Sequence, residues 1–264
     1  MEIHPVTDAD DPRIAAYRQI RERDLRARAG EFIAEGEVVL RVLVQASRHR
    51  CRSVLIDGRR LDKLRPILAC LAPGTPVYVG DQGVVDAVAG FHLHRGILAL
   101  AEEAEPLEAE ALLADAPERA VVLALFGISN HDNMGGLLRN AAAFGAHAVL
   151  LDETCCDPLY RKAIRVSVGA ALRVPFARWG AGIDPVAALA AHGFQPLSLS
   201  PAGETTLAGL TPPPRAAVLL GTEGPGLPET VLARTRTVRI PMAQGWDSLN
   251  VATTAGIVLH HLSA

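Results

Sequence analysis

Hydrophobic and polar positions follow different patterns in the two halves of this 264-residue chain. In the second half, short runs that are almost entirely apolar alternate with longer runs in which apolar residues recur every three or four positions. The short runs predict buried strands, and the periodic runs predict helices that cover them. The predicted strands are 120–126, 148–151, 195–199, 216–220 and 237–240. The predicted helices are 134–144, 158–171, 185–191, 228–233 and 249–262.

Strands that are apolar throughout and alternate with helices are typical of a parallel sheet covered on both faces. We therefore expect an α/β domain at 119–264. The first half predicts a smaller α/β unit at 1–101, in which residues 1–12 form a loose polar tail. Its predicted helices are 13–30, 37–46 and 61–70, and its predicted strands are 53–56, 75–79 and 96–101. Residues 102–118 are the predicted linker.

Composition narrows the class of protein. Hydrophobic residues make up 49% of the chain and aromatic residues 4%, which suits an α/β protein and argues against disorder. The chain contains neither an apolar run of membrane-spanning length nor a signal-peptide pattern, so we expect a soluble, cytoplasmic protein without a membrane partner. Its four cysteines form no C-x-x-C pair and are expected to be reduced and structural. The histidine and cysteine pairs lack further ligands at suitable spacing, so no metal is expected.

Charge is distributed unevenly, although the net charge is only -3. Residues 41–65 contain eight basic residues and two acids, whereas residues 102–118 contain seven acids and no base. Arginine can bind a phosphate through two parallel hydrogen bonds, which makes the first stretch a candidate nucleic-acid surface. Charge alone leaves a solvated protein face equally open.

Three polar, glycine-rich segments, 130–140, 220–226 and 240–252, follow predicted strands. Polar loops at the carboxyl ends of parallel strands are where such sheets bind ligands. Arg139 lies off the buried face of its predicted helix, so its guanidinium is either open to a ligand or simply solvated. A dinucleotide site is disfavoured because the full G-x-G-x-x-G spacing is missing. In the last segment, Asp247 or Ser248 is the expected helix N-cap, with Asn250 in the first turn.

These segments resemble the three ordered motifs of the SpoU (TrmH-like) RNA methyltransferases of the SPOUT class. The first is Asn133-x-Gly-x-x-x-Arg139, the second is Gly221-x-Glu-Gly-x-Gly226, and the third ends in Ser248-Leu-Asn-Val-Ala. The resemblance is continuous over 119–264, and residues 30–101 resemble the family's small N-terminal substrate-binding domain more weakly. Asn130 and Thr222 depart from the family pattern, in which many members have Asp at the first position and Asn or Ser at the second.

The resemblance implies a SPOUT fold with a C-terminal trefoil knot, a homodimer, and S-adenosylmethionine as cofactor. It also implies methyl transfer to a ribose 2′-hydroxyl of RNA. The expected catalytic residues are Arg139, Asn133, Glu223, Ser248 and Asn250. The expected cofactor-binding residues are Leu199, Leu220, Gly221, Glu223, Gly226, Ile240, Met242, Leu249, Asn250 and Ala252.

The RNA substrate is expected to be ribosomal RNA, with a role in rRNA processing, because the chain ends with its last helix and lacks the tail of some tRNA-acting members. RNA binding then falls to the N-terminal domain, with the expected contacts Arg41, Arg48, Arg50, Arg52, Arg59 and Arg60. A tRNA methyltransferase and a catalytically inactive RNA-binding relative remain alternatives. Arg139 is expected to position the hydroxyl and stabilise its developing charge, because the pKa of arginine, above about 12, suits a general base poorly.

Overall fold

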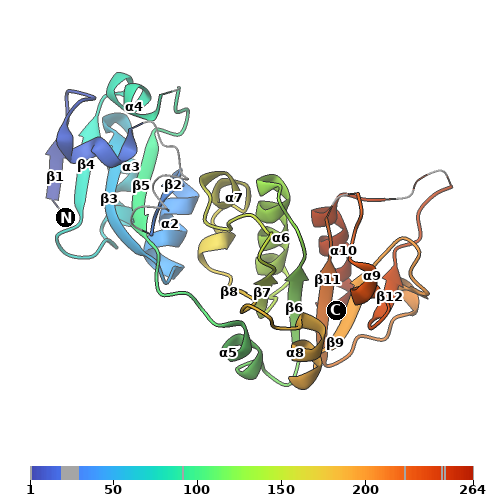
Figure 1. The fold of residues 1–264 in the computed structure, drawn as a ribbon. Coiled ribbons are helices and arrows are strands. Elements are labelled where there is room, and N and C mark those ends of the chain that lie inside the picture. Colours follow the sequence, from blue (N-terminus) through green and yellow to red (C-terminus); the bar gives the residue numbers. More distant parts are fainter. Residues whose placement is uncertain are drawn as a thin grey trace. The chain divides into compact units, whose positions relative to one another are not determined.

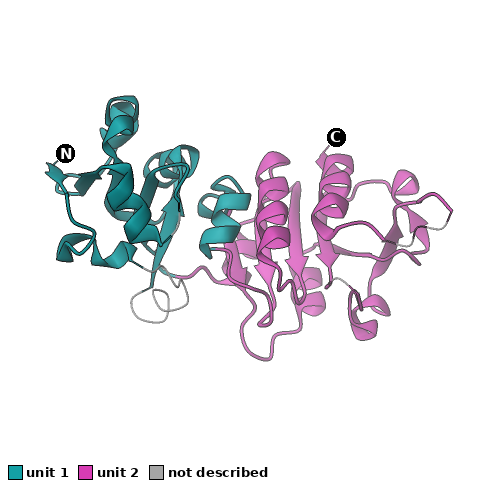
Figure 2. Ribbon diagram, turned by 90° about the horizontal axis from the view of Figure 1, so that it is seen from above, with its two compact units in different colours: residues 1–105, 159–173 teal, residues 106–158, 174–264 magenta. Residues whose placement is uncertain are grey.

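Strands and helices alternate along the described chain, as the hydrophobic pattern predicts (Figure 1). The computed structural model describes residues 2–18, 30–90, 92–222, 224–244, 246 and 248–263. Tertiary contacts divide the chain into two units (Figure 2). The first unit comprises Met1–Glu105 and Leu159–Arg173, and the second comprises Pro106–Pro158 and Val174–Ala264.

The first unit has a mixed sheet in the described residues, with strand order β1-β4-β3-β5-β2. The strands β1, β4 and β3 run parallel, whereas β5 runs antiparallel to both β3 and β2. In this order, the strands are Glu2–Pro5, Pro76–Gly80, Arg50–Asp57, Ile97–Glu102 and Glu31–Glu35. The helices of the first half are α2 (Glu37–Ala46), α3 (Leu61–Leu68) and α4 (Gln82–Ala89).

The prediction that residues 1–12 form a loose tail is wrong. Strand β1 pairs with β4, and Val6 is buried in the core of this unit. The pairing partner lies more than seventy residues away in the sequence, so a local hydrophobic pattern does not reveal it. Most of the predicted helix 13–30 lies outside the described residues, and Pro12–Tyr17 forms a 3₁₀ helix. The Tyr17 hydroxyl lies 2.6 Å from the Ser53 hydroxyl, and complete burial raises the pKa of Tyr17.

Residues 159–173 pack with the first unit, although they interrupt the sequence of the second. They contain α7 (Arg161–Val166) and the 3₁₀ helix Ala170–Leu172. Helix α7 contacts β2, and Arg161 lies 3.1 Å from the buried Glu35 carboxylate. The structural unit therefore differs from the continuous stretch 119–264 expected from the sequence. The functional division into substrate-binding and catalytic domains stays a prediction.

The second unit is built on a sheet whose strand pairs are all parallel, in the order β10-β12-β9-β11-β6-β7-β8. This confirms the predicted α/β class with a parallel sheet. The trefoil knot stays a prediction. In the order of the sheet, the strands are Thr205–Thr206, Arg236–Arg239, Gln195–Leu199, Arg215–Leu220, Ala120–Leu125, Ala148–Leu151 and Phe176–Arg178.

Helices cover both faces of this sheet (Figure 1). Buried side chains of α5 (Ala109–Ala114) and α8 (Pro185–Ala191) share a core with alternate residues of β6, β7 and β11. The intervening strand residues point to the other face, where α10 (Val251–Ser263) contacts β11 and packs against α6 (His131–Ala143). A short helix, α9 (Glu229–Leu232), precedes β12.

The predicted acidic linker 102–118 includes α5, whose Leu113 is fully buried in the core of the second unit. Ala109, Leu113 and Ala116 lie on one face of this segment, so it packs while its acidic side chains point outward. None of the helices in the described ranges is long and apolar enough to span a membrane.

Candidate active site

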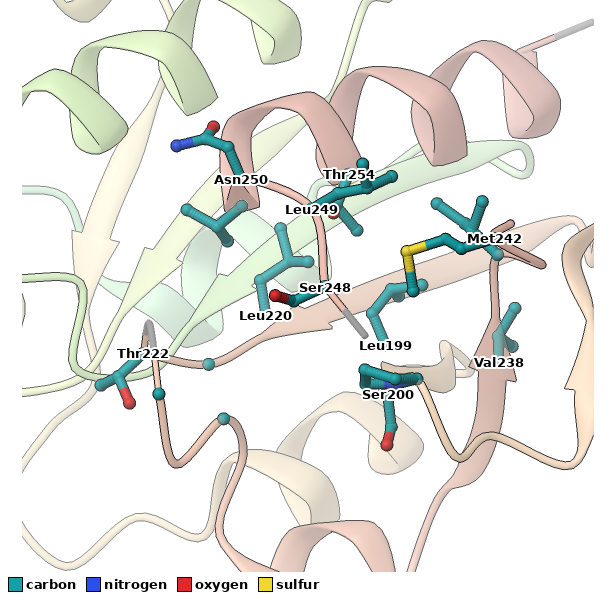
Figure 3. Close-up of a pocket in the computed structure, with 16 residues that line it drawn as sticks. Leu199, Ser200, Leu220, Thr222, Val238, Met242, Ser248, Leu249, Asn250 and Thr254 are labelled. Atoms are coloured by element: carbon teal, nitrogen blue, oxygen red, sulfur yellow. The ribbon is translucent and has the colours of Figure 1, made fainter. Parts of the chain in front are cut away.

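A cavity of about 490 Å³ opens at the carboxyl ends of β9, β11 and β12, next to the start of α10 (Figure 3). Ligands of parallel α/β sheets bind at this end of the strands. Most of the residues expected to bind the cofactor line this cavity. They are Leu199, Leu220, Gly221, Gly226, Ile240, Met242, Leu249 and Asn250.

Other lining residues were not expected from the sequence: Ser200, Pro201, Thr222, Gly224, Val238, Val251 and Thr254. Ser200 and Pro201 directly follow β9, so the rule that ligands bind at strand ends was enough to find them. Thr254 lies one turn inside α10, and no local signal distinguishes it from a solvated helix residue. Its place follows only from the position of α10 beside the cavity.

The loop after β11 folds back onto its own start. The amide of Gly226 donates to the carbonyl of Thr222 at 3.2 Å. A β-carbon on Gly221 would lie 2.3 Å from the carbonyl carbon of Gly226, so only glycine fits there. Glu223, expected in both the catalytic and the cofactor sets, lies outside the described residues. Both of its expected roles therefore stay predictions.

Asn250 caps α10, which begins at Val251 rather than before Asn250 as expected. Its Oδ1 accepts hydrogen bonds from the amides of Ala252 at 2.9 Å and Thr253 at 3.3 Å. An amide oxygen in this position satisfies two backbone donors that the helix itself cannot pair. The expected cap at Ser248 is wrong for this reason, and Asp247 lies outside the described residues.

The nitrogen of the same amide connects α10 to α6. Asn250 Nδ2 donates to Asn133 Oδ1 at 2.8 Å, and Asn133 is buried in the first turn of α6. Helix α6 is itself capped by Asn130, whose Oδ1 accepts from the Asp132 amide at 2.8 Å. Figure 3 shows the Asn250 amide directed away from the cavity. The two helices are therefore held together where both begin, beside the cavity.

Ala252, expected on the cofactor side, faces α6 and does not line the cavity. Its carbonyl accepts a hydrogen bond from Asn140 Nδ2 at 2.6 Å, and its β-carbon lies against Gly136. This position follows from the packing of the two helices, which the hydrophobic pattern of each helix does not determine. The contact supports the helix pair that forms one side of the site.

Arg139 is exposed on α6, and within the described ranges it makes no hydrogen bond or ion pair. It is not among the residues that line the cavity. Ser248 is exposed and lies at the cavity, directly before Leu249. The structure thus brings Ser248, Asn250 and Asn133 together, and it leaves Arg139 open to solvent.

Comparison with known proteins identifies the family. Residues 120–260 match the model described as the SpoU rRNA Methylase family. A Mycobacterium tuberculosis protein named as an uncharacterised tRNA/rRNA methyltransferase is 37% identical over 270 residues, which cover 98% of this chain and 91% of the relative. This chain belongs to the SpoU family of RNA methyltransferases.

Solved structures have the same fold. An AdoMet-bound rRNA methyltransferase from Sinorhizobium meliloti superposes with a TM-score of 0.80 at 21% identity, covering 98% of this chain and 97% of that chain. An RNA 2′-O ribose methyltransferase gives 0.78 at 24% identity, with 98% of each chain covered. The SpoU methyltransferase AviRb from Streptomyces viridochromogenes, in complex with AdoMet, gives 0.76 at 24% identity, covering 96% of this chain and 97% of that one.

The arginines expected to bind RNA all lie in the first unit of this SpoU family member. Strand β3 separates two groups of them. Arg48, Arg50 and Arg52 lie at or just before its start, whereas Arg59 and Arg60 directly follow its end. Arg41, on α2, pairs with Glu37.

The thiols of this SpoU protein are free, and burial raises the pKa of Cys155 to about 12. Its sulfur accepts a hydrogen bond from the Ile128 amide at 3.3 Å, which fits a structural rather than a nucleophilic role. Within the described ranges, no group of three or more His, Cys, Asp or Glu side chains is placed to hold a metal ion.

Proposed function

We propose that this SpoU family member is an S-adenosylmethionine-dependent RNA 2′-O-ribose methyltransferase that acts on ribosomal RNA in the cytoplasm as a homodimer. The observation that carries the proposal is the cavity at the carboxyl ends of β9, β11 and β12. It is formed by the same segments that carry the family's second and third motifs. A tRNA substrate is the alternative within the enzyme class, because relatives are named as tRNA/rRNA methyltransferases.

The cavity suits S-adenosylmethionine in size and in chemistry. Its volume of about 490 Å³ lies within the roughly 300–1,000 Å³ typical of cofactor sites. Leu199, Leu220, Ile240 and Leu249 provide apolar walls for an adenine ring. Gly221 lets the loop backbone approach a ligand closely. When bound, the cofactor supplies a methyl group activated by its positively charged sulfur.

The main task of the protein is then to align the ribose hydroxyl and to stabilise the negative charge that develops on its oxygen. We assign this task to Arg139, because its exposed guanidinium has no competing partner in the described part of the chain. Arginine keeps its proton, so it donates hydrogen bonds and does not remove the hydroxyl proton. We assign Ser248 to contact with the bound molecules, because it lies at the cavity.

Asn133 and Asn250 act as positioning residues in this proposal. Asn133 is buried and accepts a hydrogen bond from Asn250, so it orients the start of α10 instead of contacting RNA. Asn250 lines the cavity with part of its surface while its amide holds the two helices together. Glu223 stays assigned to the cofactor loop by the family motif alone.

Two measurements test the proposal in sequence. Calorimetry with S-adenosylmethionine is expected to give one site per chain. Incubation with labelled cofactor and unmodified bacterial rRNA is expected to give 2′-O-methyl nucleosides, identified by mass spectrometry after digestion. Cofactor binding without transfer to rRNA or tRNA would favour the inactive relative. Methylation confined to bases would contradict the assigned acceptor.

The choice between the two RNA classes needs a separate comparison. Ribosomal RNA and tRNA are offered at equal nucleotide concentration, and the initial rates of methyl transfer are compared. We expect a clear preference for rRNA, which agrees with the rRNA methyltransferase among the structures of the same fold. A faster rate with tRNA would establish the alternative substrate.

A further inference from the structure

The basic stretch 41–65 is continuous in sequence, but β3 divides it between two edges of the first sheet. In the register of the three neighbouring strands, Glu35 pairs with Leu98 and Ile56 with Ile97. The end of β2, the end of β3 and the start of β5 therefore meet at one edge. Arg50 and Glu31 both pair with Glu102 at the other. Eight residues of β3, at about 3.3 Å each, place the two edges roughly 23 Å apart.

At the first edge, basic side chains outnumber the carboxylates that they contact. Glu37 pairs with Arg41 at 3.2 Å and with Lys63 at 2.6 Å, so two cations share one carboxylate. Asp57 pairs with Arg59 at 2.6 Å, yet 71% of the Arg59 side chain remains exposed. These contacts hold the cations in place and leave them accessible.

Two further arginines at this edge have no carboxylate partner in the described residues. The Arg95 side chain lies over the backbone of Gly36, where a β-carbon would come within 2.9 Å of its Cδ. Gly36 has a φ of +98°, which also favours glycine. Arg60 donates to the carbonyl of His94 at 2.9 Å. Both arginines are therefore positioned by backbone contacts, while their charges stay uncompensated.

Helix α7 adds two more arginines to the same edge. Arg161 and Arg165 lie 3.1 Å and 3.6 Å from the single carboxylate of Glu35, the last residue of β2. The Glu35 side chain is only 7% exposed, whereas that of Arg165 is 39% exposed. We call the first edge, formed by Arg41, Arg59, Arg60, Lys63 and Arg95 with these two α7 residues, the basic edge.

The opposite edge has the reverse balance. Its three arginines, Arg48, Arg50 and Arg52, lie among four glutamates, Glu31, Glu102, Glu103 and Glu105. Arg52 pairs with Glu102 at 3.0 Å, and Arg48 donates to the backbone carbonyl of Glu105. An RNA backbone at this edge would meet as much negative as positive charge.

We propose that the RNA backbone docks on the basic edge, and that Arg48, Arg50 and Arg52 contribute little to its binding. Phosphates are the partner that exposed, preoriented arginines recognise best, through paired hydrogen bonds. This inference rests on the proposed function in that it takes RNA as the substrate. It narrows the predicted RNA contacts to Arg41, Arg59 and Arg60, and it adds Lys63, Arg95 and the arginines of α7.

Two double variants of equal charge change test the proposal. Lys63→Gln with Arg95→Gln removes two cations from the basic edge, and Arg50→Gln with Arg52→Gln removes two from the opposite edge. Affinity for a labelled RNA stem-loop of mixed sequence is measured by fluorescence anisotropy at several salt concentrations. We expect the first variant to bind at least about tenfold more weakly, with a salt slope reduced by about 1.5, since each phosphate contact contributes about 0.7–0.9. The second variant should stay within about twofold of the parent protein.

Equal losses in the two variants, or a larger loss at the opposite edge, would overturn the proposal. Arg95→Lys serves as a second test, because it keeps the charge at the same position. It should retain most of the affinity that Arg95→Gln loses, and an equal loss in both would contradict a phosphate contact. Circular dichroism confirms that each variant is folded before its affinity is compared.

Methyl transfer is measured on the same samples to separate this proposal from the proposed function. If RNA affinity follows the expected order but no methyl group is transferred, the basic edge stands and the proposed activity fails. If methyl transfer occurs but the two double variants bind RNA equally, the activity stands and the basic edge fails. Calorimetry with S-adenosylmethionine should give the same affinity for both double variants, since their substitutions lie in the first unit and the cavity lies in the second.

Discussion

Asn250 combines two contacts in a single amide. Its oxygen caps α10, and its nitrogen reaches Asn133 on α6. Both contacts lie beside the cavity, so the residue affects the shape of the site as well as the stability of the helix. The expected position of Asn250 in the first turn missed both contacts, because cap geometry depends on where α10 starts.

Replacing Asn250 separates the two contacts. Asn250→Ala removes both and should lower the free energy of unfolding by about 1–2 kcal/mol, whereas Asn250→Ser keeps a capping oxygen and should lose about 1 kcal/mol less. Urea denaturation measures both values. Equal destabilisation by Ala and Ser would show that the cap contributes nothing at this position.

Arg139 gives the sharpest test of the chemistry at the residue scale. Arg139→Ala should lower kcat by about 10²–10³, the usual cost of losing one donor to a developing oxyanion, and leave cofactor affinity unchanged. Arg139→Lys should recover little, because lysine lacks the planar fork. Arg234→Ala, which removes another exposed arginine of the second unit, is the matched control and should keep full activity. A Lys variant with most of the parent turnover would exclude a role for the fork.

The loop after β11 is the element whose backbone path most constrains the cavity. Gly221 stands where the strand ends, against the returning backbone of Gly226 and Leu227. The glycine-rich sequence predicted a tight loop here. The close return of the chain, which makes this glycine necessary, depends on contacts that the tertiary structure supplies.

Gly221→Ala should therefore widen the loop and weaken S-adenosylmethionine binding by at least about tenfold, because a β-carbon there cannot be accommodated without moving backbone. Calorimetry measures the affinity. Gly180→Ala is the control, since a β-carbon there would make only an ordinary 3.4 Å contact with Ile183. Unchanged affinity in Gly221→Ala would remove this loop from the cofactor site.

At the scale of the whole molecule, the two units differ in how many carboxylates depend on cationic partners. The hydrogen bond from the Arg13 side chain lowers the pKa of Asp11 to about 2, and that from His92 does the same for Asp86. Contacts with Arg59 and Lys63 lower the pKa values of Asp57 and Glu37. All four acids lie in the first unit, whereas Asp184 is the corresponding acid in the described part of the second.

A carboxylate with a lowered pKa in the folded state stabilises the fold above its ordinary pKa, and this contribution disappears as the pH falls toward the lowered value. For Asp11 and Asp86 that window runs from the ordinary 3.8 down to about 2. We therefore expect acid to destabilise the first unit before the second. Limited digestion with pepsin at about pH 3 should release peptides from the first unit first.

Asp86→Asn is the matched variant, because its amide cannot be protonated in this range. It should be less stable than the parent protein near neutral pH, and its stability should change less as the pH falls. Simultaneous release of peptides from both units at low pH would contradict the expected order.

How far sequence alone reaches depends on the distance over which each feature is encoded. The apolar runs of β6, β7, β9, β11 and β12 were recognised because burial on both faces marks every residue of such a strand. Strands β1, β2 and β8 and helices α4 and α5 were missed. Strand β1 is an edge strand, and in α5 only one face of a short segment is apolar, so the local signal is weak.

By itself, the sequence determined the α/β class, the three motif segments and, through them, the family. Each of these is written in residues that lie close together along the chain. Only the tertiary structure decided that Asn250 meets Asn133, that α7 leaves its sequence neighbours to pack on β2, and that the basic stretch 41–65 divides between two edges of a sheet. These features arise from contacts between residues far apart in sequence, which packing selects and local pattern does not encode.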